Sequence, residues 1–329
     1  MLRGAPLIRL SVALLMAVSL TACSGLPADV GAHSSTGWKS GASGDGVANG
    51  SFGQWRGQRV DIAGTWNDSF DAQTEQWTVQ EGMEYGDWNR DLDVAVGGIY
   101  KDRGESWADA ADGAYDDRWR EALRELRSAW KGRDGTLYIR FAHEFNGDWY
   151  PWSVTGDEVS DFTQAWARFH DLQEEILPEH RLVFCPNSET TADLDLDWRD
   201  AFPGAEEVDV VAVDFYNDWH WVDSERDFTK VSRKTDGKGA PLGLEAHRQF
   251  AEDVGKPFAV PEWSSNAEKG DAPEFVEELH QWVLQHAGTG GGQLLYEIQF
   301  NVSEYGDGKY ELDADSKQPR AAKAYKRLW

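Results

Sequence analysis

The feature that most constrains the fold of this chain is a series of short apolar segments, separated by longer stretches of which several carry apolar residues at helical spacing. Eight segments have the length of strands, and several are nearly continuous runs of valine, isoleucine, leucine and phenylalanine. Such runs are typical of strands that are buried on both faces of a parallel sheet. The predicted strands cover residues 46–55, 59–66, 92–100, 136–144, 181–187, 208–216, 257–263 and 293–301.

Three of the intervening stretches, residues 116–130, 162–177 and 272–286, carry apolar residues at helical spacing. Eight strands with interleaved helices in about 280 residues have the size of a (β/α)₈ barrel. We therefore predict an α/β protein with a single TIM barrel over residues 47–329. An open doubly wound sheet is the alternative, and the count of eight favours the barrel. No glycine-rich nucleotide-binding motif follows a predicted strand, so dinucleotide and nucleoside-triphosphate chemistry lack support.

The first 23 residues have the pattern of an export signal. Arg3 and Arg9 precede an apolar run at residues 10–20, which is shorter than the roughly 20 residues that span a bilayer. Leu20-Thr-Ala-Cys23 resembles a bacterial lipobox, in which the cysteine is lipidated; an ordinary signal peptide is the alternative. Residues 24–46 are rich in glycine, serine and alanine, and are expected to form a flexible tether. The sequence thus predicts an extracellular protein that a lipid on Cys23 anchors to the cell membrane.

Charge and cysteine content limit the function classes. The chain has 32 basic and 58 acidic side chains, a net charge of −26, which argues against nucleic acid as a partner and disfavours acidic polysaccharides. A neutral substrate fits better, although the charge can also serve solubility alone. Cys185 is the one cysteine besides Cys23, and it lies in an apolar run, so we expect a buried and inert thiol. The 17 tryptophans are numerous, and tryptophan faces stack well on sugar rings.

Glu144 and Glu262 each lie at the end of a predicted strand. In a barrel of this kind, the carboxyl ends of the strands face the active site. An ionised carboxylate turned into a barrel costs several kcal/mol unless it has a partner, and a pair of carboxylates is the equipment that cleaves a glycosidic bond. Strand alternation groups each glutamate with two neighbours: Arg140 and Ala142 with Glu144, and Phe258 and Val260 with Glu262. The alternative is that one of the two glutamates is a surface residue.

Aromatic residues follow these strand ends. Glu144 leads into Phe145-Asn-Gly-Asp-Trp149-Tyr-Pro-Trp152, in which Asn-Gly indicates a turn that would present three aromatic side chains. The sixth predicted strand ends in Asp214-Phe-Tyr-Asn-Asp-Trp-His220. A carboxylate, a phenol, an imidazole and an indole at one strand end are the composition of a polar cleft with aromatic walls.

Residues 140–152, Arg140-Phe-Ala-His-Glu-Phe-Asn-Gly-Asp-Trp-Tyr-Pro-Trp152, resemble the acid/base segment of glycoside hydrolase family 26, which is typified by β-mannanases. Asp214-Phe-Tyr216 resembles the strand-six Asp-x-Tyr of that family, and Pro261-Glu-Trp263 resembles its nucleophile segment. The resemblance covers residues 46–329. It implies a retaining glycosidase, most simply an endo-β-1,4-mannanase. The eighth strand lacks the Trp-Arg signature of mannan-cleaving members, so β-glucan, β-1,3-xylan and an exopolysaccharide stay open as substrates.

The resemblance also implies roles for single residues. Glu144 would be the general acid/base, and Glu262 would be the nucleophile that forms a covalent glycosyl-enzyme. The implied sugar-site residues are His143 and Trp149 beside the scissile bond, Tyr216 as a hydrogen-bond partner of the nucleophile, and Asp214 as a residue that positions its neighbours. His143 can reach the site beside Glu144 only if the strand alternation breaks, for example at a β-bulge.

Asn187, at the end of the fifth strand, and the indoles of Trp152 and Trp263 are further expected sugar contacts. We expect no cofactor and no metal, because the chain lacks an H-E-x-x-H motif and clustered cysteines and histidines. The expected partner is a polysaccharide, bound by a monomer. Two other functions stay open: a non-catalytic carbohydrate-binding lipoprotein, and a metal-dependent hydrolase that uses His143, Asp214 and His220.

Overall fold

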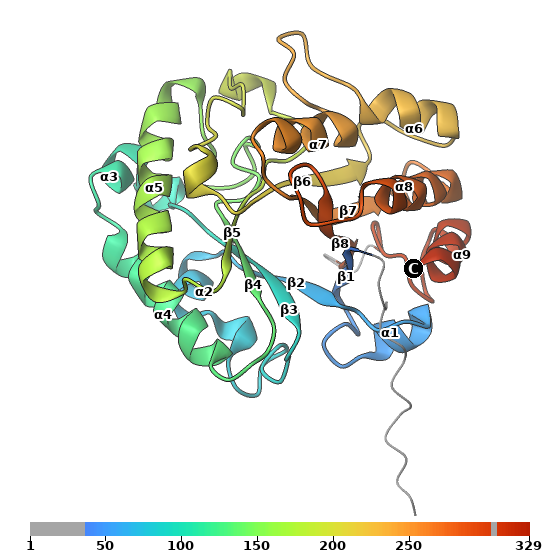
Figure 1. Ribbon diagram of the computed structural model, residues 1–329, viewed down its shortest axis with the longest axis horizontal. Coiled ribbons are helices and arrows are strands. Elements are labelled where there is room, and N and C mark those ends of the chain that lie inside the picture. Colours follow the sequence, from blue (N-terminus) through green and yellow to red (C-terminus); the bar gives the residue numbers. More distant parts are fainter. Residues whose placement is uncertain (1–36, 304–307) are drawn as a thin grey trace, which may run out of the picture.

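The computed structural model describes residues 37–303 and 308–329. Eight parallel strands form a closed barrel in which each strand pairs with the next along the chain and the last pairs with the first (Figure 1). The strands are β1 (Lys39–Gly44), β2 (Ile62–Asn67), β3 (Asp91–Val96), β4 (Leu137–Phe141), β5 (Arg181–Phe184), β6 (Val210–Asn217), β7 (Phe258–Ser265) and β8 (Leu294–Asn301). The predicted (β/α)₈ barrel is confirmed.

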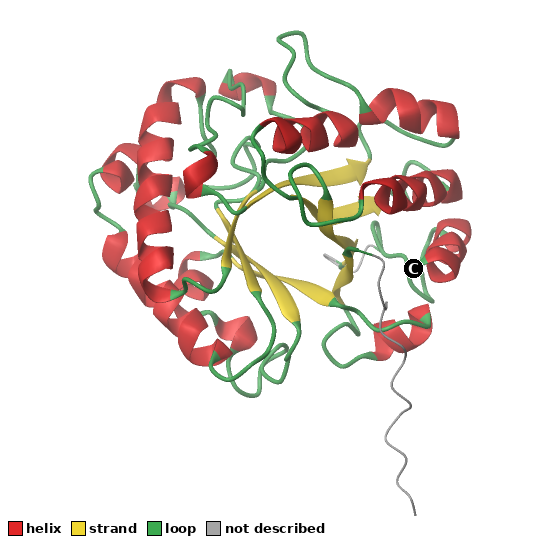
Figure 2. Cartoon of the chain, in the orientation of Figure 1, coloured by secondary structure: helices red, strands yellow, loops and turns green. Residues whose placement is uncertain are grey.

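Helices surround the barrel on its outer side (Figure 2). They are α1 (Ser51–Arg56), α2 (Phe70–Glu75), α3 (Trp107–Ala111), α4 (Asp116–Trp130), α5 (Val159–Ile176), α6 (Glu225–Ser232), α7 (Leu244–Asp253), α8 (Pro273–His286) and α9 (Pro319–Leu328). The three predicted helices correspond to α4, α5 and α8. None of the helices in the described ranges has both the length and the apolar character needed to cross a membrane.

The first strand differs from the prediction. Residues 46–55, predicted as a strand, contain most of α1, and β1 is formed by the upstream sequence Lys-Ser-Gly-Ala-Ser-Gly. This segment has no apolar pattern because it lies tightly between β2 and β8. A Cβ atom on Gly41 would lie 2.6 Å from the carbonyl oxygen of Ile62 and 2.8 Å from that of Glu297. Small residues are therefore a steric requirement here.

The position of β1 also corrects the predicted domain boundary. Residues 39–44 belong to the barrel, so the barrel begins before residue 47 and the predicted tether of residues 24–46 is too long at its carboxyl end. The predicted signal peptide, Cys23 and the first part of the tether lie outside the described residues.

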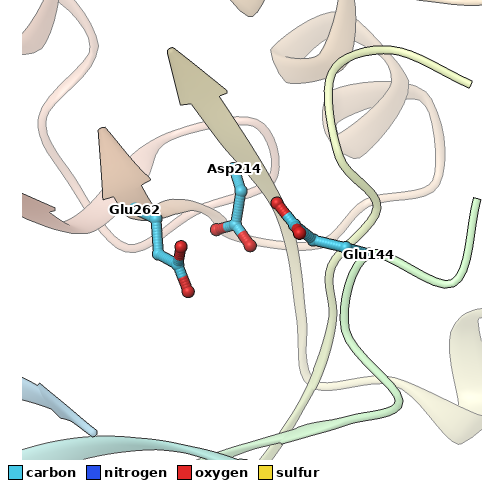
Figure 3. Close-up of side chains that lie close together, drawn as sticks. All are labelled: Glu144, Asp214 and Glu262. Carbon is cyan, nitrogen blue, oxygen red and sulfur yellow. The ribbon is translucent and has the colours of Figure 1, made fainter. Parts of the chain in front are cut away.

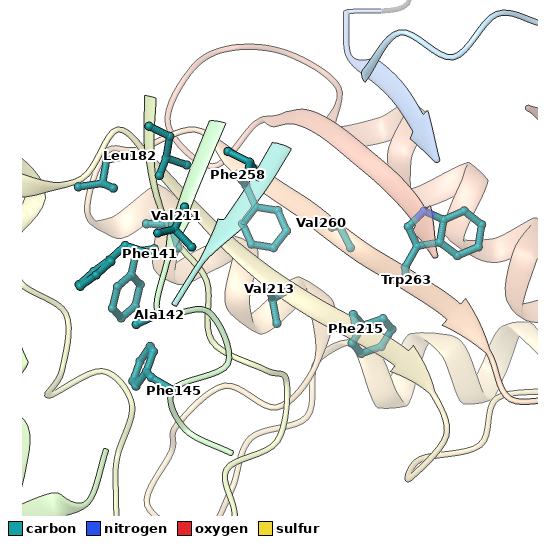
Figure 4. Packing of buried hydrophobic residues seen from close by; sticks show 14 of the residues in the cluster. Phe141, Ala142, Phe145, Leu182, Val211, Val213, Phe215, Phe258, Val260 and Trp263 are labelled. Carbon is teal, nitrogen blue, oxygen red and sulfur yellow. The ribbon is translucent and has the colours of Figure 1, made fainter. Parts of the chain in front are cut away.

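Strand side chains separate into two buried layers, as alternation requires. The interior layer consists of Ile62, Tyr138, Val183, Cys185, Val210, Ala212, Ala259, Tyr296 and Ile298. The outer layer packs under the helices and includes Phe141, Val211, Val213, Phe258, Val260 and Trp263 (Figure 4). Cys185 is a buried free thiol, as predicted. The carboxyl ends of the strands carry polar side chains instead, and these form the site.

Candidate active site

Three carboxylates meet at the carboxyl ends of the strands. Glu144 follows β4, Asp214 lies in β6 and Glu262 lies in β7 (Figure 3). One oxygen from each of the three groups lies within 4.8 Å of the others. Glu144 and Glu262 are 7% and 5% exposed, and both line a cleft of about 1010 Å³. The two glutamates that the sequence singled out therefore face each other across one cleft.

Glu144 reaches the cleft because the chain turns sharply after β4. The strand ends at Phe141, and Ala142 and Glu144 have φ angles of 49° and 52°, a left-handed conformation that residues other than glycine rarely adopt. The backbone N–H of Glu144 donates to the carbonyl of Cys185 at 2.8 Å and fixes this turn. Ala142 packs in the outer apolar layer and does not share a face with Arg140, contrary to the prediction. Two left-handed residues, and not a β-bulge, break the alternation.

Glu262 reaches the cleft because β7 is irregular. The pairing of β7 with β8 shifts register between Val260 and Trp263. Val260 packs in the outer layer, so strict alternation would turn Glu262 outward as well. The shift turns Glu262 inward and Trp263 outward, and the predicted grouping of Phe258 and Val260 with Glu262 is wrong. Pro261 lies within the shift, where its lack of an N–H is tolerated.

Three donors hold the carboxylate of Glu262. Arg140 Nη1 donates to Oε1 at 2.8 Å, and the indole Nε1 of Trp66 donates to the same oxygen at 2.9 Å. The hydroxyl of Tyr216 donates to Oε2 at 2.8 Å, which is the contact that the family resemblance implied. Trp66 lies near the end of β2, and nothing in the sequence pointed to it.

Arg140 is the buried cation of the site. Its Nε contacts Asp93 Oδ1 at 2.6 Å, and its Nη1 contacts Asp214 Oδ2 at 3.0 Å in addition to Glu262. Tyr296 also donates to Asp93, at 2.7 Å. Burial, and then repulsion by Glu262, raises the pKa of Asp214 well above its ordinary value. One guanidinium thus contacts three carboxyl groups.

Two donors hold Glu144. Asn187 Nδ2 donates to Oε1 at 2.6 Å, and Trp149 Nε1 donates to Oε2 at 2.8 Å. Burial, and then the charge of Glu262, raises the pKa of Glu144 to about 7. The backbone N–H of Asn187 is held by Asn146 Oδ1 at 2.8 Å, so two loops position the donor. Glu144 is therefore poised between its acid and its carboxylate near neutral pH.

Five of the predicted site residues line the cleft: Glu144, Glu262, Trp149, Tyr216 and Asn187. Asp214 does not line it, but lies buried between the two glutamates and Arg140, where it can act only through its neighbours. Trp149 is 52% exposed, so a large part of its ring is available to a ligand.

The other three predicted sugar contacts lie away from the cleft surface. His143 is buried, and its Nε2 lies 3.1 Å from the hydroxyl of Tyr150. Trp152 stacks on Tyr150 at 4.3 Å between ring centroids, and its Nε1 donates to the His143 carbonyl. These two residues support Tyr150, which does line the cleft. Trp263 is buried in the outer layer, and its Nε1 donates to Glu297.

The cleft also contains residues to which the sequence analysis assigned no individual role, and several of them belong to the aromatic segments after Glu144 and Asp214. Its further aromatic walls are Trp66, Tyr150, Phe215, Trp219, Phe300 and Tyr310, and its further carboxylates are Asp68, Asp148, Glu189 and Asp218. Among the residues that the structure describes, no lysine or arginine lines the cleft, and His220 pairs with Glu189 at 2.7 Å. The walls therefore suit an uncharged ligand with stacking faces.

The carboxylates Glu144, Asp214 and Glu262 are, among the described residues, the one group of three acidic, histidine or cysteine side chains close enough to hold a metal ion. Both oxygens of each glutamate already accept hydrogen bonds from N–H or O–H donors, and Arg140 supplies positive charge. These hydrogen-bond donors and the guanidinium of Arg140 stabilise the two carboxyl groups themselves, and such surroundings favour carboxyl groups over a bound cation. His143 and His220 do not join it, so the set proposed for a metal-dependent hydrolase does not come together.

The comparisons with known proteins agree with the geometry. Residues 121–240 match the model of glycosyl hydrolase family 26, and this range includes Glu144, Asn187 and Tyr216. No curated protein matches the sequence.

Three solved structures with a similar fold are described as GH26 proteins. The catalytic domain of an endo-β-1,4-mannanase from Bacillus sp. JAMB-750 is 14% identical, with a TM-score of 0.58 over 88% of this chain and 85% of that one. GH26C from Muricauda sp. MAR_2010_75 is 13% identical, with a TM-score of 0.60 over 89% and 85%. The β-mannanase BoMan26A from Bacteroides ovatus is 13% identical, with a TM-score of 0.56 over 89% and 88%. The match over the segment that carries Glu144, together with the barrel fold, identifies the chain as a glycosidase.

Proposed function

We propose that the chain is a member of glycoside hydrolase family 26 that cleaves β-mannan internally and with retention of configuration. The observation that carries this proposal is the approach of Glu144 and Glu262 to within 4.8 Å between carboxylate oxygens. Retaining glycosidases hold their two carboxyl groups about 5–5.5 Å apart, whereas inverting ones need about 6.5–9.5 Å to admit a water molecule. The observed spacing supports direct attack by one carboxylate.

In the first step, an oxygen of Glu262 attacks the anomeric carbon, and the bond from that carbon to the leaving oxygen breaks. Glu144 transfers its proton to that oxygen, and the product is a glycosyl ester of Glu262. The raised pKa of Glu144, about 7, lets it carry this proton near neutrality.

In the second step, the negative charge of Glu262 is consumed in the ester, and the repulsion that raised the pKa of Glu144 disappears. Glu144 is then a carboxylate that takes a proton from water. The water oxygen attacks the anomeric carbon, the ester bond breaks, and Glu262 returns as a carboxylate.

The choice of mannan rests on the resemblance and on the β-mannanases of similar fold. The cleft agrees with a neutral glycan, because its walls are aromatic and acidic. Mixed-linkage β-glucan and β-1,3-xylan meet the same chemical requirement and are therefore the comparison substrates.

The test is a panel of these three polysaccharides, with new reducing ends as the readout and the anomer of the first product determined by NMR. The wild type is expected to cleave mannan with retention. Glu262→Ala and Glu144→Ala are expected to lose activity by at least about a thousandfold. Glu174→Ala, a change of an exposed α5 residue, serves as the matched control. Native-rate hydrolysis by Glu262→Ala would show the assignment to be wrong, and mannan binding without cleavage by the wild type would favour a non-catalytic lipoprotein.

We further propose that the protein is exported as a monomer and anchored by a lipid on Cys23. The lipobox-like sequence supports this proposal. Labelling of cells with a radioactive fatty acid should mark the wild type and leave Cys23→Ala unlabelled, and gel filtration of the detergent-extracted protein tests the monomer.

A further inference from the structure

Trp66 occupies an unusual place beside the proposed nucleophile. It lies near the carboxyl end of β2, on the opposite side of the barrel from β6 and β7, and its Nε1 reaches Glu262 Oε1 at 2.9 Å. This N–H is therefore used inside the protein, while the indole ring lines the cleft.

The ring of Trp66 is held by β8. Phe300 packs against it edge-on, with ring centroids 5.4 Å apart, and the same phenyl ring packs against Tyr216 at 5.7 Å. Phe300 thus contacts both of the uncharged donors to Glu262. The end of the eighth strand, which lacks a tryptophan, thus supports these two donors through Phe300.

The sharing of Arg140 among three carboxyl groups explains why Glu262 needs a further, uncharged donor. Arg140 contacts Asp93 and Asp214 as well as Glu262, so its N–H groups are divided among three carboxyl groups. A nearly buried carboxylate therefore needs hydrogen-bond donors in addition to a shared cation. An indole N–H stabilises the charged form without adding a further ionisable group.

We propose that Trp66 is a positioning residue for the nucleophile: its N–H fixes Glu262 Oε1 and so holds the carboxylate in one orientation. Oε1 then carries two hydrogen bonds, from Arg140 and Trp66, and Oε2 carries one, from Tyr216. Oε2 has the freer lone pair and is the oxygen that attacks. This inference rests on the proposed function.

The test uses 2,4-dinitrophenyl β-mannobioside, whose leaving group departs without a proton, so that kcat/KM reports the attack of Glu262. Trp66→Phe keeps an aromatic ring and removes the N–H. We expect kcat/KM to fall by about 10- to 100-fold, the usual effect of losing one hydrogen bond to a charged group. In single-turnover experiments, the rate of glycosyl-enzyme formation should fall by the same factor while substrate binding stays nearly unchanged, because the N–H of Trp66 is bonded to the nucleophile and not to the sugar.

Trp77→Phe is the matched control, since Trp77 is 44% exposed and lies outside the cleft, and it should leave both readouts unchanged. Benzothienylalanine at position 66 replaces the N–H by sulfur in nearly the same shape and should reproduce the effect if Trp66→Phe folds poorly.

Two results separate this inference from the proposed function. If wild-type hydrolysis disappears in Glu262→Ala but Trp66→Phe keeps the wild-type kcat/KM and single-turnover rate, the role of Trp66 is overturned and the function stands. If the wild type shows no hydrolysis that depends on Glu262, both are overturned.

Discussion

At the scale of single residues, the site depends on one carboxyl group that is held between two protonation states. Burial and Glu262 raise the pKa of Glu144, whereas the hydrogen bonds from Asn187 and Trp149 lower it, and the balance is about 7. Each of these influences comes from a different strand end or loop. A change in any one of them should therefore move the pH range in which Glu144 can act as an acid.

Removing the Asn187 donor gives the clearest case. In Asn187→Ala, the carboxylate form of Glu144 loses a hydrogen bond, so the pKa of Glu144 rises above about 7. The first step needs the protonated form, so kcat/KM falls as the pH rises through this pKa. We expect the alkaline limb of kcat/KM for mannan to move up by about one pH unit. A titration between about pH 5 and pH 9 measures it.

The control for this prediction is Asn89→Ala, because Asn89 is exposed and its side chain contacts Asp134, away from the cleft. An alkaline limb that stays in place, or moves to lower pH, in Asn187→Ala would contradict the account of Glu144.

The residues that the sequence predicted are those whose position follows from strand ends and the family motif, above all Glu144, Glu262 and Tyr216. Asp93 could have been predicted from the sequence as a residue with a buried partner, because an acidic side chain inside an apolar strand needs one. The sequence does not predict the role of Trp66. Its contact with Glu262 crosses the barrel, and β2 and β7 lie across from each other only because the barrel is closed.

At the scale of elements, apolar runs predicted most of the strands, but the sequence did not predict the steric limits in β1 or the register of β7. β1 is a strand of small residues that sequence composition assigns to a linker. β7 looks regular, yet its register shift turns Glu262 inward and Trp263 outward. Register depends on the neighbouring strands, which a single segment does not contain.

The steric requirement in β1 can be tested with one methyl group. Gly41→Ala would place its Cβ 2.6 Å from the backbone oxygen of Ile62 and 2.8 Å from that of Glu297, so the backbones of β2 and β8 must move. Overpacking of this kind typically costs about 1–3 kcal/mol, and we expect the free energy of unfolding in urea to fall by that amount. Gly237→Ala should be tolerated, because no atom lies within 4 Å of the added Cβ. Equal stability of the two variants would mean that β1 has more space than described.

At the scale of the whole molecule, the count of eight strands was correct although one of the eight predicted segments is not a strand. The barrel closes through β1 and β8, and the substitute strand lies only a few residues upstream of the predicted one. Fold class is robust to such an error, since it depends on the repeated pattern of strands and helices more than on any one segment.

The net charge of −26, which includes the acidic side chains that line the cleft, gives the last prediction. The charges of the protein exert no long-range force on a neutral polymer, so kcat/KM for mannan should change less than about twofold between roughly 20 and 500 mM NaCl. Carboxymethylated mannan is repelled by the same cleft, and its kcat/KM should be lower and should increase with salt as the repulsion is screened. Initial rates with both polymers at several salt concentrations measure this. If the carboxymethylated polymer is the better substrate at low salt, the cleft prefers anions and the choice of a neutral glycan is wrong.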